Sequence, residues 1–202
     1  MTREATDKSA LIDQLQMLRE SVLWKLEGLS EYDLRRPLTP TGTNLLGLVK
    51  HLAGCEFGYF GSVFGRPAPI DMPWATPDAP ANADMWATPD ESAEFIVDGL
   101  YRRSWEHARQ TLDALDLDST GFVPGWPVEH VTVQQILVHM IVETARHAGH
   151  ADIVRELIDG SAGRLRDSDN LPYTDGDRWR AQVARVQSAA DTFRIGSGGP
   201  TI

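Results

Sequence analysis

Apolar residues recur every three to four positions in four long segments of the chain, which is the spacing of one buried face on an α-helix. The segments run at about 9–29, 44–64, 88–115 and 132–160, and a shorter one follows near 177–193. We find no convincing strand pattern and no internal repeat. The pattern therefore predicts an all-α protein, a helical bundle with an extra C-terminal helix.

Capping signals predict where two of these helices begin. Thr88-Pro89-Asp90-Glu91 combines an N-cap residue, a proline at the first helical position and a glutamate three residues after the cap. Thr132 and Gln135 form a second capping box, and Gly160 is a natural C-terminal stop. The third helix is thus expected from Thr88, and the fourth from Thr132 to Gly160.

A connection rich in proline, residues 66–88, joins the second and third helices and contains Trp74 and Trp86. Loops of this length are uncommon in compact domains unless they have a role. Two interpretations carry equal weight: the loop covers a site at the end of the bundle, or it is a packed crossover anchored by its tryptophans. Residues 1–202 are expected to form a single domain with its core at about 8–160 and a flexible tail at 196–202.

Composition argues against several classes of function. The 202 residues include 29 acidic and 19 basic side chains and carry a net charge of -10, so no nucleic-acid partner is expected. No apolar run reaches the roughly 18 residues of a membrane span, and the N-terminus does not resemble a signal peptide. Cys55 is the only cysteine, so the fold does not depend on a disulfide. We expect a cytoplasmic protein with no membrane partner, and a homodimer is compatible with the sequence.

The fourth predicted helix holds the most informative polar residues, because His139, Glu143, His147 and His150 share one side of it. The apolar stripe of this helix is set by Val133, Ile136, Met140, Thr144, Ile153 and Leu157 or their close neighbours. His147 lies well inside the stripe with Glu143 beside it, where an ionised glutamate is costly unless it is paired or binds a metal. A pair at i and i+4 can hold a metal, but a core histidine bonded to the glutamate explains the pattern equally well.

A third ligand has to come from another helix. His51 shares a face of the second helix with Gly47, Gly54 and Gly58, and several glycines on one face indicate either close approach by another helix or room for a site. Periodicity alone does not select His51, because a solvated histidine is the commoner outcome at such a position.

Structural explanations are favoured for the other polar candidates. We expect Cys55 to be a small core residue, and Glu56 and His107 to be surface or locally paired groups. Trp126 precedes the fourth helix and could wall a site, but a core anchor is the favoured interpretation. His107 and His130 are not expected to take part in metal binding.

Three segments of the chain resemble the DinB-like superfamily. Residues 39–56 (TPTGTNLLGLVKHLAGCE) look like its second-helix segment, residues 143–152 (ETARHAGHAD) like its metal-bearing last core helix, and residues 82–91 (NADMWATPDE) like the segment that opens its third helix. The resemblance covers about residues 8–160. It implies a four-helix bundle with one long crossover loop and one divalent metal ion, zinc or nickel, near one end.

The resemblance places His51, Glu143 and His147 at the metal-binding positions and leaves His139 and His150 outside the ligand set. A glutamate in the middle departs from the three-histidine pattern and is similar to the His-Glu-His set of mycothiol-dependent maleylpyruvate isomerases and related thiol transferases. It implies an enzyme whose metal, zinc before nickel, activates a low-molecular-weight thiol such as mycothiol toward an electrophilic substrate. The alternatives are a non-catalytic, stress-related metal-binding module and a bundle kept only for partner binding.

Overall fold

The computed structural model describes residues 3–194, with side chains from residue 7 onward. The chain forms two compact units, Met1–Ser168 and Asp169–Ile202. The first contains every helix and strand up to α5, and the second contains α6 (Gly176–Asp191). The tail expected to be flexible, 196–202, lies outside the described residues.

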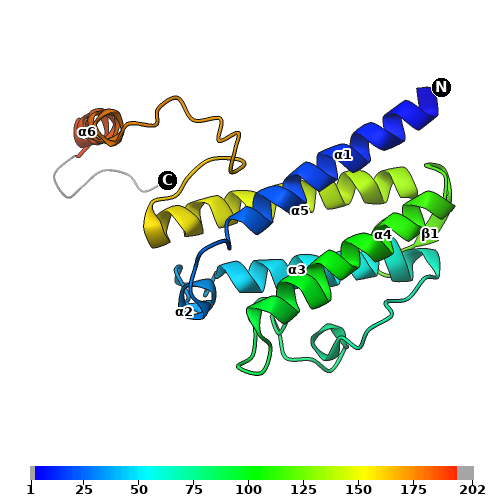
Figure 1. The fold of residues 1–202 in the computed structure, drawn as a ribbon. Coiled ribbons are helices and arrows are strands. Elements are labelled where there is room, and N and C mark those ends of the chain that lie inside the picture. Colours follow the sequence, from blue (N-terminus) through cyan, green and yellow to red (C-terminus); the bar gives the residue numbers. More distant parts are fainter. Residues whose placement is uncertain (1–2, 195–202) are drawn as a thin grey trace. The chain divides into compact units, whose positions relative to one another are not determined.

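Four long helices build the first unit: α1 (Arg3–Trp24), α3 (Leu45–Glu56), α4 (Arg103–Ala114) and α5 (Val133–Asp159). α1 packs along α5, and α3 packs against both α4 and α5 (Figure 1). Apolar side chains from all four helices fill the interior between them. The all-α, DinB-like bundle expected from the sequence is confirmed.

Helix α1 is shorter at its C-terminal end than the apolar pattern predicts. It stops at Trp24, and the chain turns through Gly28, whose φ of 75° is a left-handed conformation that glycine adopts without strain. A short helix, α2 (Glu31–Arg35), follows and is capped by Ser30. Apolar side chains such as Leu26 are buried here although their backbone is not helical. The apolar pattern reflects burial, so it continues past the end of the helix.

The second predicted helix, 44–64, is confirmed in extent but is irregular at its end. α3 continues through a π-helical turn, η1 (Phe57–Gly61), and a 3-10 turn, η2 (Ser62–Phe64). Another π-helical segment, η4 (Phe95–Arg102), leads into α4, and a 3-10 turn, η3 (Pro73–Ala75), interrupts the long loop. Irregular helical turns often lie at functional sites, and η1 borders the cavity described below.

The third helix does not begin at Thr88. Thr88 and Glu91 form a turn instead, in which the backbone N–H of Thr88 donates to Oε2 of Glu91 over 2.7 Å. The guanidinium of Arg35 donates to the backbone oxygens of both residues, which holds them in this turn. The helix starts after Ser92, whose hydroxyl accepts the backbone N–H of Phe95. The capping pattern therefore does mark a local structure, but that structure is a turn and not the start of the helix.

Two short strands correct the expectation that the chain has none. β1 (Thr120–Phe122) pairs antiparallel with β2 (His130–Thr132), with Gly121 opposite Val131. Three residues are too few for an alternating pattern to stand out in a sequence. The second strand of the hairpin leads directly into α5.

Helix α5 begins and ends as predicted, with the capping box of Thr132 and Gln135 and with Gly160 in a left-handed conformation. Its buried face differs from the predicted stripe in the second half, where Ile153 and Leu157 are 59% and 61% exposed. The buried positions keep a spacing of three to four residues and continue through His147, Ala148, Ala151 and Val154. The prediction followed the large apolar side chains there, whereas the packing follows the spacing.

Glu56, expected on the surface or in a local pair, is fully buried. Arg19 of α1 donates to both of its carboxylate oxygens, over 2.7 and 2.6 Å, and the hydroxyl of Ser104 on α4 lies 3.4 Å away. A buried charge is tolerated when it is paired and hydrogen-bonded. Together with Ser104, the pair connects three helices of the bundle across the core.

The second unit contains the predicted C-terminal helix. The side chain of Asp175 caps α6, and Val183 and Val186 on this helix are exposed.

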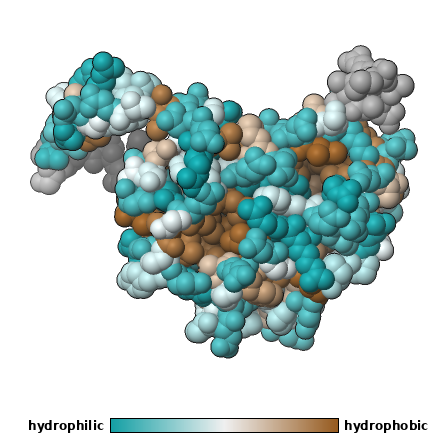
Figure 2. Space-filling view, in the orientation of Figure 1, coloured by the Kyte–Doolittle hydropathy of each residue, from teal (hydrophilic) through white to brown (hydrophobic). Residues whose placement is uncertain are grey.

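Hydrophilic residues cover most of the face of the molecule in Figure 2, and hydrophobic residues gather in smaller areas. Within residues 3–194, no helix combines the length and the apolar character that crossing a membrane requires.

Candidate metal centre

α3 and α5 bring the three predicted ligands together at one point. Nε2 of His51 lies 3.1 Å from Oε1 of Glu143, and Nε2 of His147 lies 3.0 Å from the same oxygen. The centres of the two imidazole rings are 4.8 Å apart. Two histidine nitrogens from different helices therefore face one carboxylate oxygen.

The cluster is buried on one side and open on the other. The side chain of His147 is 10% exposed, whereas those of His51 and Glu143 are 20% and 25% exposed. His147 lies inside the buried face of α5, as the periodicity predicts, and Glu143 lies at its edge. The cluster is therefore accessible at His51 and Glu143 and closed at His147.

Asp84, a residue that the sequence reasoning missed, orients His51. Its Oδ2 lies 2.6 Å from Nδ1 of His51, so that Nδ1–H donates to the carboxylate and Nε2 faces Glu143. A carboxylate behind a histidine is a common support of metal ligands. The sequence offered one indication of this role, because Asp84 lies in segment 82–91, which resembles the DinB-like superfamily. On the other side, Nδ1 of His150 lies 3.2 Å from Nδ1 of His147.

Cys55 packs against the core, as expected, but it is half-buried and also borders the cluster. Its Sγ lies 3.5 Å from Nε2 of His51. His51, Cys55 and Glu143 each offer one ligand atom, and these three atoms lie within 4.8 Å of one another. The spacing of Cys55 four residues after His51 equals that of Glu143 and His147, and this repeat could have identified it.

The electrostatics at this point favour a positive charge. Burial lowers the pKa of His51, but its hydrogen bonds with Cys55, Asp84 and Glu143 outweigh burial and raise the pKa to about 10. Burial raises the pKa of Glu143, yet the bonds with both histidines hold it below its ordinary value. Burial and the neighbouring His51 lower the pKa of His147. A positive charge is thus stabilised between the carboxylates of Asp84 and Glu143. Either a proton or a metal ion can provide that charge.

The donor set fits a divalent metal ion. Ligand atoms about 2.1 Å from a shared ion lie roughly 3.0 to 3.4 Å from one another. The nitrogen-to-oxygen separations of 3.0 and 3.1 Å match that range. Imidazole and carboxylate ligands, with a thiol beside them, suit borderline ions such as zinc and nickel.

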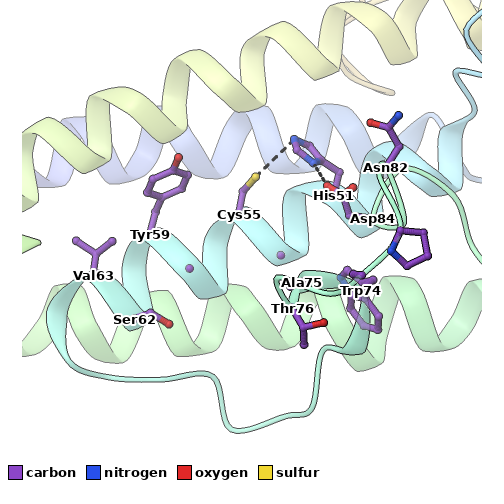
Figure 3. A pocket seen from close by; sticks show the side chains of 14 residues that line it. His51, Cys55, Tyr59, Ser62, Val63, Trp74, Ala75, Thr76, Asn82 and Asp84 are labelled. Atoms are coloured by element: carbon purple, nitrogen blue, oxygen red, sulfur yellow. Dashed lines mark hydrogen bonds and ion pairs between the residues drawn. The ribbon is translucent and has the colours of Figure 1, made fainter. Parts of the chain in front are cut away.

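A cavity of about 520 Å³ opens beside His51. One wall comes from α3, η1 and η2, and the other from the proline-rich loop, including Trp74 and Asn82. In Figure 3, Cys55 and His51 lie on successive turns of the helix, and Asp84 reaches His51 from the loop. Both interpretations of the loop hold in part: it borders the site, and Trp74 packs on the core, while Trp86 is 52% exposed.

The glycines of α3 and η1 explain how the loop and the cavity fit against the helix. A Cβ on Gly47 would lie 1.8 Å from the backbone oxygen of Met85, so the close approach is by the loop and not by another helix. A Cβ on Gly58 would meet nothing within 4 Å, and Gly54 and Gly58 both line the cavity. The glycine face therefore serves close packing at one end and open space at the other.

His139 lies one turn before Glu143 on α5 and contacts the aromatic rings of Tyr59 and Trp126, at centroid distances of 4.5 and 4.8 Å. Burial lowers the pKa of His139. Trp126 packs against the core cluster around Met140, which supports the interpretation as a core anchor.

His107 and His130 have other neighbours. Nε2 of His107 donates to the backbone oxygen of Arg66 over 2.9 Å, so this half-buried histidine is paired across to the loop rather than on the charged surface. The ring of His130 packs on Phe122 within the hairpin, at 5.5 Å between centroids.

The fold and the cluster define a class: a DinB-like helical bundle with a histidine and carboxylate cluster between two of its core helices. The model of one family, described as mycothiol-S-transferase, matches residues 10–160, the greater part of the chain. The chain belongs to this family. None of the curated proteins matches it.

Proposed function

We propose that the protein is a metal-dependent transferase of a low-molecular-weight thiol, with His51, Glu143 and His147 as the protein ligands of one divalent ion. The observation that carries this proposal is the convergence of two histidine nitrogens on Oε1 of Glu143. Membership of the mycothiol-S-transferase family supports mycothiol as the thiol. Zinc is the favoured ion, with nickel as the second choice.

The residues around the cluster prepare it for this chemistry. Asp84 holds the Nδ1–H of His51, so that Nε2 is the nitrogen that would give up its proton to bind an ion, and Glu143 supplies the negative charge that balances a cation. A divalent ion held by these residues would lower the pKa of a bound thiol and so supply a thiolate nucleophile near neutral pH. Transfer to an electrophilic substrate then needs no separate protein base.

The cavity beside His51 is suited to hold the thiol. Its volume of about 520 Å³ lies in the usual range for small-molecule sites. Ser62, Thr76 and Asn82 offer hydrogen bonds to the hydroxyl and amide groups of a sugar-containing thiol, and Trp74 offers an apolar wall. The loop forms one wall of the cavity, and we expect it to limit the access of water, which would favour transfer over hydrolysis.

The second candidate is a non-catalytic, stress-related metal-binding module. The observation that favours it is Cys55, whose Sγ lies 3.5 Å from Nε2 of His51 and could close the ligand shell. Closed four-ligand shells are typical of structural metal sites. The two functions differ in whether mycothiol turns over.

Metal content, thiol binding and turnover test the proposal together. We expect one ion per chain in the wild type, a melting temperature that rises with mycothiol, and loss of the ion in His147→Ala. Glu143→Gln should lower metal retention and thiol-dependent turnover in parallel. Turnover that survives complete removal of the metal would contradict the mechanism. If mycothiol leaves the melting temperature of the metal-loaded protein unchanged, the binding module is favoured.

A further inference from the structure

We propose that Cys55 is a fourth protein ligand of the metal, and that it holds the position facing the cavity until an external thiol replaces it. The inference rests on the proposed metal centre and deepens it, because it names the group with which the substrate thiol competes. It also reconciles the two candidate functions, since one site is closed at rest and open during turnover.

The first support is the geometry of two matched pairs. His51 and Cys55 lie four residues apart on α3, and Glu143 and His147 lie four residues apart on α5. Residues at this spacing share a helix face, and the two faces meet at one point. Sγ of Cys55 lies 3.5 Å from Nε2 of His51, the nitrogen that lies 3.1 Å from Oε1 of Glu143. The same nitrogen therefore lies within 3.5 Å of one donor from each helix.

The second support is the position of the sulfur on the cavity wall. Cys55 is half-buried and lines the cavity, and its neighbours along the wall, Gly54 and Gly58, have no side chains that would cover it. Glu143 and His147 are not among the residues that line this cavity. A molecule that reaches the cluster from the cavity therefore meets Cys55 and His51 first.

The exchange balances in protons and bonds. When Cys55 binds the metal, the sulfur–metal bond forms and the thiol proton leaves to solvent, as metal binding to cysteine requires. When an external thiol takes the position, its sulfur–metal bond forms as it loses a proton, the bond between Cys55 and the metal breaks, and Cys55 takes a proton back. No oxidant or reductant is needed, and no disulfide forms.

Cobalt substitution of the full-length protein tests the ligand directly. Cysteine sulfur bound to Co²⁺ gives a charge-transfer absorption in the near ultraviolet, and Cys55 is the only cysteine. In the absence of added thiol, we expect this band in the wild type. Cys55→Ala and Cys55→Ser should each lose the band and still bind one cobalt ion per chain. Ser62→Ala, which changes another cavity residue, is the matched control and should keep the band.

Alkylation tests the displacement. Iodoacetamide, in large excess over any added thiol, should modify Cys55 slowly in the metal-loaded protein, and at least about tenfold faster after addition of 2-mercaptoethanol or of a chelator. Bound cobalt without the band in the wild type would overturn the role of Cys55 and leave the proposed metal centre standing. A chain that binds no cobalt would overturn the metal centre itself. If 2-mercaptoethanol leaves the alkylation rate unchanged, Cys55 is not displaced and that part of the inference is wrong.

Discussion

His51 is held from two sides, by Asp84 at Nδ1 and by Glu143 at Nε2. The two contacts have different consequences, because one fixes the orientation of the ring and the other brings it to the shared point between α3 and α5. A metal ligand depends on both, since a ring that can rotate loses affinity even when its nitrogen stays available. Replacing Asp84 therefore removes the contact that orients the ring of His51 and leaves the nitrogen that faces Glu143 unchanged.

Asp84→Asn tests this at the residue scale. The amide keeps the shape of the side chain but no longer holds the Nδ1–H of His51 with a full charge, so we expect metal affinity to fall by about 10- to 100-fold. Competition with a fluorescent chelator measures the affinity. Asp78→Asn, in the same loop and exposed, is the matched control and should leave affinity unchanged. Equal affinity in Asp84→Asn and wild type would contradict the orienting role.

At the scale of elements, the site depends on how α3 contacts its neighbours. Its buried end is tied to α1 by Glu56 and Arg19, and its first turn lies directly against the proline-rich loop at Gly47. The first contact holds the helix in the bundle, and the second holds the loop that carries Asp84. Each contact has a substitution that probes it.

Glu56→Gln should destabilise the protein by about 3 kcal/mol, because it leaves the buried guanidinium of Arg19 without a charged partner. Chemical denaturation measures the free energy of unfolding. The exposed pair of Glu106 and Arg109 provides the control, and Glu106→Gln should cause no measurable change. A loss no larger than that of the control would show that the buried pair contributes little.

Gly47→Ala should displace the loop, because its Cβ would overlap the backbone oxygen of Met85. We expect lower thermal stability together with weaker metal binding, since Asp84 moves with the loop. Gly149→Ala on α5 is the control: its Cβ would meet nothing within 4 Å, and alanine is the better helix former, so stability should rise by up to about 1 kcal/mol. Unchanged metal affinity in Gly47→Ala would separate the loop from the site.

At the scale of the whole molecule, the candidate site and the family match lie within the first compact unit. The second unit contributes none of the residues named in the cluster or the cavity. A chain ending at Ser168 is therefore expected to bind one metal ion with the affinity of the full chain, measured by metal analysis and chelator competition. Loss of the ion from the shortened chain would show that the site needs the second unit. A homodimer stays a prediction, which light scattering can check.

The sequence by itself determined the helical class, the capping of α5 and the pairing of Glu143 with His147. These follow from local rules: apolar spacing, side chains that bond to nearby backbone groups, and residues four apart on one helix face. Resemblance supplied His51, which periodicity did not select.

Tertiary structure alone decided which distant residues meet. It placed Asp84 on His51 across 33 positions of sequence, turned the capping signal at Thr88 into a loop contact with Arg35, and buried Glu56 against Arg19. It also brought Cys55, which already lies four residues after His51 on α3, close to Glu143 on α5. These contacts depend on the packing of helices and a loop far apart in the chain, and no local spacing in the sequence records how such segments pack.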